Sequence, residues 1–378
     1  MDQNSLARRL PTAALAFRGY NVTNMGRSRE LLEIAAYAST VEGHLRMISV
    51  AAGETLGRKM DLVQRVRSGE ETSLDTYADA IGLILAMEAA QLALLKEHFG
   101  IDVSGAQFSF GYSLGEIAAL AAGEVLDWTE ALQIPLLLSA DCVELARDMT
   151  LGVLFTRSAE LPLDAIRRTA QQVNHQGRGV MGISSYLAPN SMLLLGQQDT
   201  LDRFAEMAKR TLKVKFYLRK NEHRWPPLHT PIIWEKHIAD RAAQRMHTLG
   251  IHLVAPRPRV LSLVTGLFSY TDTNCRDLLR RWVDHPQRLW DAVETTLSSG
   301  ITTVIHVGPE PNLVLATFRR VSDNVQAQVE DSFSLRALSA AAHRSWLKRL
   351  LPQRAALLRA PHLEHIVLED WLIENAPR

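Results

Sequence analysis

Ser113 stands between two glycines in the sequence GYSLG, residues 111–115. This G-x-S-x-G frame is typical of a nucleophilic serine on a tight strand-to-helix turn, where flanking glycines avoid clashes of Cβ atoms. The residues before it, QFSF (107–110), have strand character, and EIAALAAGEVL (116–126) after it is helical in pattern. Free N–H groups at the start of such a helix can stabilise an oxyanion. The frame therefore predicts Ser113 as a nucleophile.

A serine hydroxyl needs a base, and the chain has 13 histidines. His229, in the segment RWPPLHTPIIWEKHI (224–238), differs from the others because two prolines fix its approach and Thr230-Pro231 begins a predicted helix. His237 and His252 have the setting of ordinary helix or surface histidines. His306 falls in a predicted strand before a glycine-proline turn. His229 is therefore the preferred candidate for the base.

The composition excludes several classes of protein. Of the 378 residues, 47% are hydrophobic and the formal net charge is +1, so no global field indicates nucleic acid or an anionic membrane as a partner. The two cysteines, Cys142 and Cys275, cannot make a disulfide framework, and nothing near them has the spacing of metal ligands. The N-terminal segment lacks the apolar core of a signal peptide, and no membrane span is expected. These features favour a globular protein of the reducing cytoplasm.

The elements needed to hold such a turn are strands that alternate with helices. Strands are predicted at 12–17, 260–266 and 302–308, a long buried helix at 77–100 that ends at Gly100, and helices within 276–300. We expect an α/β fold, with a mostly parallel sheet in a large subdomain formed by residues 1–148 and 218–322. Residues 149–217 alternate strands with amphipathic helices and predict a small inserted α+β unit.

The pattern loosens beyond residue 322, and residues 323–378 are predicted as a C-terminal helical extension. Within it, residues 334–360 carry basic side chains beside leucines. This segment is either a helix that packs on the domain with a solvated basic face or a docking surface for an acidic partner protein.

Several segments resemble one known family. GYSLGEIAALAAGEVLDWTEAL (111–132) resembles the GHSLGExxALxxAGxL signature of malonyl-CoA:acyl-carrier-protein transacylases and of the acyltransferase domains of fatty-acid and polyketide synthases. The likeness continues in order over about residues 12–320. Four further segments carry it: MGRSRELL (25–32), GISSYLAPNSMLLLGQQDTL (182–201), PLHTPII (227–233) and HPQRLWDAVETTLSSGITTVIHVGPEPNLV (285–314).

The resemblance implies a fold, a mechanism and partners. The large subdomain would be α/β-hydrolase-like and the small one ferredoxin-like. Ser113 would take an acyl group from a thioester, and His229, oriented by a backbone carbonyl rather than a carboxylate, would be the general base. The backbone N–H groups of Leu114 and Tyr20 would hold the oxyanion. Acyl-CoA or acyl-carrier protein would be the substrates, an acyl carrier protein the partner, and no metal or redox cofactor is implied.

The departures from the family lie where the acyl group should sit. Malonyl-selective members carry an arginine twenty-five positions after the serine, and here that position is Leu138. A leucine cannot pair with a carboxylate, and a buried, unpaired carboxylate costs several kcal/mol. Trp282 stands in place of a family glutamine, and Tyr112 in place of the histidine before the nucleophile. Pro227 and Leu228 belong to an altered segment before His229, and the loop GYNVTN (19–24) is shortened. The predicted acyl pocket is apolar, for a group without a distal carboxylate.

Alternatives remain open at this point. Arg224 or Arg147 could replace the missing arginine. The same serine–histidine pair could serve an editing thioesterase that acts on acyl carrier proteins instead of a transferase. The altered loop also allows a catalytically silent scaffold that binds a carrier protein. An unrelated serine esterase would need an acid between serine and histidine in chain order.

Overall fold

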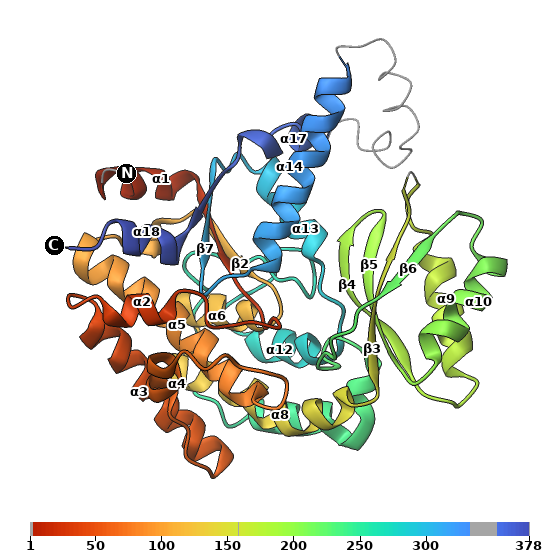
Figure 1. Cartoon of the computed structure of the whole chain (residues 1–378), viewed down its shortest axis with the longest axis horizontal. Coiled ribbons are helices and arrows are strands. Elements are labelled where there is room, and N and C mark those ends of the chain that lie inside the picture. The colour runs from red at the N-terminus through yellow and green to blue at the C-terminus, as the bar shows by residue number, and fades with distance from the viewer. Residues whose placement is uncertain (1–2, 158, 333–353, 378) are drawn as a thin grey trace.

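The computed structural model describes residues 3–157, 159–332 and 354–377 and holds two separate sheets (Figure 1). The main sheet has four parallel strands in the order β2-β1-β7-β8. Its strands are β1 (Ala13–Phe17), β2 (Phe108–Gly111), β7 (Thr303–Val307) and β8 (Glu364–Val367). In the central strand β1, Leu15 pairs with Ser109 of β2 on one side and with Ile305 of β7 on the other.

Helices cover both faces of this sheet, as a parallel sheet requires. Alternate residues of β1 point to opposite faces: Leu15 and Phe17 join one core cluster, and Ala14 and Ala16 join another. The first cluster includes α5 (Tyr77–Phe99), α6 (Leu114–Ala122) and α18 (Leu368–Glu374). The second includes α13 (Leu289–Ser298) and α14 (Leu313–Ser332).

Several of the other helices of the large subdomain pack around α5. Those around α5 are α3 (Ala38–Leu56), α4 (Leu62–Ser68), α7 (Trp128–Ala131) and α8 (Gln133–Ala146), and α2 (Ser28–Glu33) packs on α3, α4 and α18. The remainder are α1 (Gln3–Arg9), α11 (Ile238–Met246), α12 (Cys275–Asp284) and α17 (Arg354–Leu357), with short 3-10 turns at Leu10–Thr12, Val103–Gly105, Pro231–His237 and Ala360–His362.

The central helix α5 ends where Gly100 takes a left-handed conformation, with φ 63°. By length and composition alone this helix could cross a membrane, but 78% of its most apolar window is buried inside the protein. Its apolar surface is therefore used by the core.

The small subdomain is an antiparallel sheet of order β4-β5-β3-β6, at the right of Figure 1. Its elements are β3 (Met149–Phe155), α9 (Leu163–Asn174), β4 (Met181–Ala188), β5 (Ser191–Gln197), α10 (Thr200–Thr211) and β6 (Tyr217–Lys220). The chain order β-α-β-β-α-β with this strand order is ferredoxin-like. The sheet runs three residues past the expected end at 217, to Lys220.

The predicted fold class is confirmed, but two predicted elements differ. Residues 260–266, expected to be a strand, make only isolated bridges: Val260 beside Ser109 of β2, and Ser262 to Leu267. The C-terminal extension is not wholly helical, because β8 adds an edge strand to the main sheet and α18 packs against α5. An edge strand of four residues is specified by its distant partner β7 more than by its own pattern. Most of the proposed basic docking segment, residues 334–353, lies outside the described residues.

Two glycines allow β2 and the start of α6 to meet without intervening side chains. A Cβ atom on Gly111 would lie 2.0 Å from the backbone carbonyl carbon of Gly115. A Cβ atom on Gly115 would lie 2.4 Å from the Phe17 carbonyl oxygen at the end of β1. Both distances are far below van der Waals contact, so this junction requires glycine at both positions.

We expect Gly111→Ala to lower the free energy of unfolding by more than about 3 kcal/mol, because the new methyl group would overlap backbone atoms that cannot move without displacing α6. Gly43→Ala is the matched control, because Gly43 is exposed in α3 with no atom near its Cβ position. Alanine there should raise the free energy of unfolding by about 0.5–1 kcal/mol. Urea unfolding followed by circular dichroism measures both. A loss below about 1 kcal/mol for Gly111→Ala would contradict the close packing.

Candidate active site

Ser113 sits on the turn between β2 and α6 with a strained backbone. Its φ is 55° and its ψ is −116°, a region that residues other than glycine rarely adopt. Its own polar backbone groups are held by neighbours: the N–H donates to Gln287 Oε1 (3.1 Å), and the carbonyl accepts from Trp282 Nε1 (2.9 Å). The strained turn therefore presents the hydroxyl of Ser113 at the C-terminal edge of the parallel sheet.

His229 lies in direct contact with Ser113. The distance from Ser113 Oγ to His229 Nε2 is 2.7 Å, and His229 Nδ1 is 2.7 Å from the carbonyl oxygen of Trp282. Because a carbonyl can only accept, Nδ1 carries the proton in the neutral ring, and Nε2 accepts from the serine hydroxyl. Burial lowers the pKa of His229 to about 4, although the bond to the Trp282 carbonyl raises it in part. The imidazole is therefore neutral at neutral pH and oriented to take the serine proton.

The segment before His229 holds the histidine in place. His229 has a positive φ of 67°, its N–H donates to the Val283 carbonyl (2.8 Å), and Thr230 Oγ1 donates to the Pro227 carbonyl (2.7 Å). The side chain of His229 is buried, with 3% exposure. The two prolines and these bonds therefore leave the imidazole little freedom to turn away.

Two backbone N–H groups belong to residues beside Ser113. Leu114 is the first residue of α6, and Tyr20 follows Gly19 in the loop after β1. A Cβ atom on Gly19 would lie 3.4 Å from Ser113 Cβ, so this loop passes directly beside the serine. Within the described residues, neither the Leu114 nor the Tyr20 amide has a hydrogen-bond acceptor. The two amides are therefore free to donate to another group, and their role as oxyanion donors stays a prediction.

Gln287 is a site residue that the sequence did not indicate. Its side chain is fully buried, and besides accepting from the Ser113 amide, its Nε2 lies 3.4 Å from His229 Nδ1. Its backbone joins β4, because its N–H donates to the Ser184 carbonyl and its carbonyl accepts from the Tyr186 amide. It therefore links the serine turn to the small subdomain. Its position one residue after Pro286 carries no local signal for this role.

A cavity of about 320 Å³ opens beside Ser113 and His229 between the two subdomains. Four aliphatic side chains of the small sheet form one wall: Leu151, Val153, Leu193 and Leu195. Aromatic side chains form the other: Tyr20, Tyr77, Tyr112 and Trp225. The Tyr20 ring packs edge-on against Tyr77 (centroids 4.8 Å apart) and Trp225 (5.7 Å). The cavity is therefore mainly apolar.

The structure places some of the predicted pocket residues elsewhere. Tyr112 and Leu228 line the cavity, but Pro226 lines it in place of Pro227. Leu138 does not line it, because this face of α8 turns into the hydrophobic core and leaves the side chain fully buried there. Trp282 does not line it either: its fully buried ring packs behind His229, edge-on with centroids 5.2 Å apart.

Positive charge is sparse around the cavity. Arg147 and Arg224 line a separate hollow on the far side of Tyr20, beside Glu71 and Asp75, and not the cavity of Ser113. Arg320 is the one lysine or arginine among the described residues that lines it. The described residues contain no group of three or more His, Cys, Asp or Glu side chains that could hold a metal ion. Cys142 and Cys275 are both free and buried.

Comparison with known proteins gives a consistent set of relatives. No family model matches the chain. A malonyl CoA-acyl carrier protein transacylase of Haemophilus influenzae is 25% identical over 292 residues, which cover 76% of this chain and 87% of that protein. The polyketide synthase GfsA of Streptomyces halstedii is 24% identical over 261 residues, 68% of this chain but only 3% of that much longer protein.

Solved structures share the fold. FabD of Acinetobacter baumannii superposes with a TM-score of 0.65 at 17% identity, covering 82% of this chain and 91% of that one. A malonyl-transacylase solved in complex with a type II polyketide-synthase acyl-carrier protein superposes with a TM-score of 0.59 at 21% identity. The match covers 81% of this chain and 92% of that one. The homologues and structural neighbours of this chain are therefore malonyl-CoA:acyl-carrier-protein transacylases and a polyketide synthase.

Proposed function

We propose that the protein is an acyltransferase of fatty-acid or polyketide synthesis that moves an acyl group from a thioester, such as an acyl-CoA, to an acyl carrier protein through an acyl-Ser113 intermediate. The observation that carries the proposal is the 2.7 Å contact between Ser113 Oγ and His229 Nε2 at the edge of an apolar cavity. The homologues support the same reaction class.

In the first half-reaction, His229 Nε2 takes the proton from Ser113 Oγ as the oxygen attacks the thioester carbonyl carbon. The Leu114 and Tyr20 amides donate to the carbonyl oxygen as it becomes negative. The carbon–sulfur bond then breaks, the thiolate takes the proton from His229, and CoA leaves. The Trp282 carbonyl stabilises the transient imidazolium, so no carboxylate is needed behind the histidine.

In the second half-reaction, a thiol of the carrier protein gives its proton to His229 and attacks the ester carbon. The bond to Ser113 Oγ breaks and the oxygen takes the proton back. The scheme invokes no cofactor beyond the thioester substrates, because the serine and histidine supply the nucleophile and the base. An esterase unrelated to the family would need an acid behind His229, where the structure has the carbonyl of Trp282.

The walls of the cavity favour an acyl group without a distal carboxylate. Aliphatic and aromatic side chains line most of it, and a carboxylate among them would lose its hydration without gaining a cation. Arg320 lies two turns along α14 from Leu313, about 10 Å away, and its side chain is exposed.

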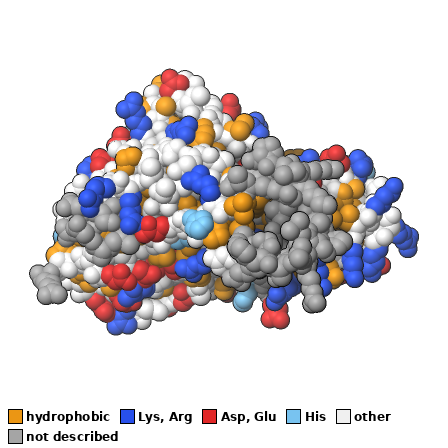
Figure 2. Space-filling view, turned by 90° about the horizontal axis from the view of Figure 1, so that it is seen from above, with side chains coloured by type: hydrophobic (Ala, Val, Ile, Leu, Met, Phe, Trp, Pro, Cys, Tyr) orange, Lys and Arg blue, Asp and Glu red, His pale blue; other side chains and the backbone are white. Residues whose placement is uncertain are grey.

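The surface of the small subdomain fits an acidic carrier protein as the acceptor. Figure 2 shows Lys and Arg side chains gathered at its right-hand end, which is the small subdomain of Figure 1. Exposed basic residues there include Lys209, Arg210, Lys213, Lys215, Arg219 and Lys220. The structural neighbour solved with its carrier protein supports such a partner. Two free, buried cysteines fit the reducing cytoplasm in which we place the reaction.

We expect the purified protein to gain the mass of the acyl group when it is incubated with acyl-CoAs of short or medium neutral acyl chains, and Ser113→Ala to gain none. Malonyl-CoA should acylate at least roughly a hundredfold more slowly, because its carboxylate would be desolvated unpaired. Intact-protein mass spectrometry measures both.

Other outcomes of this experiment separate the alternatives. An adduct from malonyl-CoA at the same rate would refute the apolar selectivity. Ser113-dependent release of CoA without an adduct would establish a thioesterase. If the folded protein reacts with neither acyl-CoA nor acyl-carrier protein, the remaining alternative is a catalytically silent scaffold that binds a carrier protein.

The pH dependence of acylation should report the buried histidine. His229 must be neutral to act as base, and its pKa is lowered to about 4, so the rate should be flat from pH 6 to 8 and fall tenfold per pH unit below about 4. Single-turnover release of CoA measures the rate, with circular dichroism to confirm the fold at each pH. A midpoint near 6.5 would show instead a solvated histidine. His229→Ala should cost about 10²–10⁴-fold at pH 7.

A further inference from the structure

The residue that follows β1, Arg18, is an arginine whose side chain is fully buried. Burial lowers the pKa of its guanidinium to about 10, with the negative charge of Glu88 the strongest opposing effect, so it is a cation at neutral pH. Glu88, fully buried in α5, accepts from the Arg18 backbone N–H (3.0 Å) through Oε1. A buried cation is costly unless its donors are satisfied, so the partners of this guanidinium show what it holds.

The guanidinium binds the loop that carries the predicted oxyanion donor. Nε donates to the Gly19 carbonyl (2.9 Å), and Nη2 donates to the Thr23 carbonyl (3.2 Å) and to Asn24 Oδ1 (2.7 Å). Nη1 donates to the Pro309 carbonyl after β7. One planar group thus joins both ends of the loop 19–24 to the edge of the main sheet.

The bond to Gly19 has a geometric consequence for Tyr20. A trans peptide unit is planar, and its C=O and N–H point in opposite directions. When Arg18 holds the Gly19 carbonyl, the Tyr20 N–H in the same peptide unit must point away from Arg18. That N–H is the one with no acceptor among the described residues, in a loop that passes beside Ser113. A flip of this peptide would turn the carbonyl toward the oxyanion instead.

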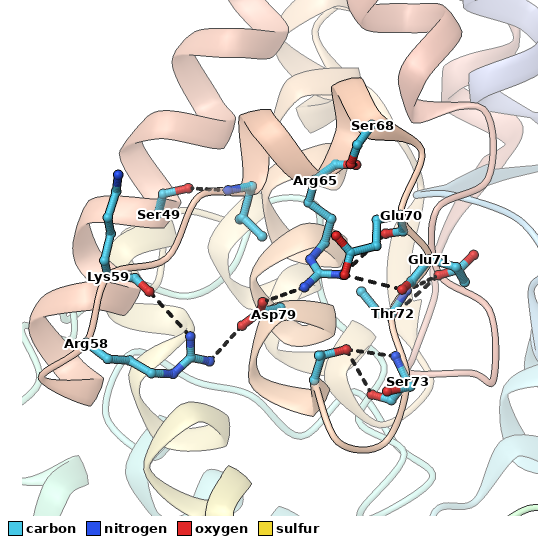
Figure 3. A network of polar contacts seen from close by, with 12 residues as sticks. Ser49, Arg58, Lys59, Arg65, Ser68, Glu70, Glu71, Thr72, Ser73 and Asp79 are labelled. Atoms are coloured by element: carbon cyan, nitrogen blue, oxygen red, sulfur yellow. Dashed lines mark hydrogen bonds and ion pairs between the residues drawn. The ribbon is translucent and has the colours of Figure 1, made fainter.

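A separate acidic group holds the far end of the loop. Glu71 accepts from the Asn24 amide (2.9 Å) through Oε1 and from the Met25 amide (3.2 Å) through Oε2. Figure 3 shows Glu71 beside Arg65, which donates to the Glu71 backbone carbonyl and pairs with Asp79. Glu71 thus anchors the Asn24 end of the loop, while at the other end the Gly19 carbonyl accepts from Arg18.

We propose that Arg18 is a positioning residue that, by holding the Gly19 carbonyl, aims the Tyr20 N–H at the oxyanion formed on attack by Ser113. This inference rests on the proposed acyl transfer. It predicts that loss of the guanidinium slows the chemical step and leaves the binding of acyl-CoA almost unchanged.

The test compares Arg18→Ala with the wild-type protein in single-turnover acylation by an acyl-CoA that acylates the wild type. The acylation rate constant should fall about 10²–10³-fold, the loss typical of one oxyanion donor, while the half-saturating acyl-CoA concentration changes less than about threefold. Guanidinium chloride at tens of millimolar should restore part of the rate, and sodium chloride at the same ionic strength should not. Arg18→Lys, with a point charge in place of the planar fork, should recover only part of the activity.

Arg359→Ala is the matched control. Arg359 also binds two backbone carbonyls, of Leu297 (2.9 Å) and Ile301 (3.0 Å), but outside the cavity. Its loss should lower thermal stability and leave acylation unchanged. If Arg18→Ala does not fold, Arg18→Met combined with Glu88→Gln removes the buried guanidinium together with its carboxyl neighbour and carries the same test.

Two results would overturn the inference while the proposed function stands: a folded Arg18 variant that acylates at the wild-type rate, or a loss confined to the half-saturating concentration with no rescue by guanidinium. Failure of the wild-type protein to acylate Ser113 would instead refute the proposed function itself.

Discussion

The site depends on a junction where the backbones of β1, β2 and α6 meet with no side chain between them. Gly111 and Gly115 make this contact possible, and it forces Ser113 into a conformation that costs of order 1–3 kcal/mol. Such strain persists only where its surroundings over-determine it. Here the indole N–H of Trp282 and the amide oxygen of Gln287 bind both backbone groups of the serine. The residues behind the nucleophile therefore serve to hold its turn, which explains why they are polar in a buried setting.

The small subdomain uses its two faces for different purposes. Side chains alternate along its strands, so Leu154 and Leu194 pack under α9 and α10, while their neighbours face the cavity. A sheet with helices on one face alone leaves its other apolar face to be buried elsewhere. Here that face packs toward the large subdomain and lines the cavity beside Ser113. The apolar character of the cavity thus follows from the ferredoxin-like architecture as well as from individual substitutions. Gln287 ties this wall to the nucleophile, so the two subdomains cannot move apart without disturbing the serine.

Local patterns in the sequence were sufficient for the alternation of strands and helices, because that alternation depends on residues close together in the chain. Local patterns also singled out Ser113 and His229, and the structure brings these two side chains into contact. Counting residues along a helix predicts less well which side chains line the pocket. Leu138 was placed in the pocket by its spacing from Ser113, but spacing along the chain does not give the rotation of α8, and the side chain packs in the core. Arg18 and Gln287 had no local signal, since their partners lie far along the chain and only the assembled fold brings them together.

The loop after β1 shows why selectivity and catalysis are hard to change separately in this protein. The backbone N–H of Tyr20 is the proposed oxyanion donor, and its ring packs against Tyr77 and Trp225 in the wall of the cavity. A substitution that reshapes the acyl pocket at this position therefore also disturbs the peptide that faces the reacting carbonyl. A group that binds the loop on the side away from the cavity can hold this peptide without contacting the acyl group. The shape of the pocket and the placement of the peptide then depend on different residues. The buried guanidinium of Arg18 is such a group, because within the loop it binds the Gly19 and Thr23 carbonyls and Asn24 Oδ1, and it leaves the ring of Tyr20 to the substrate.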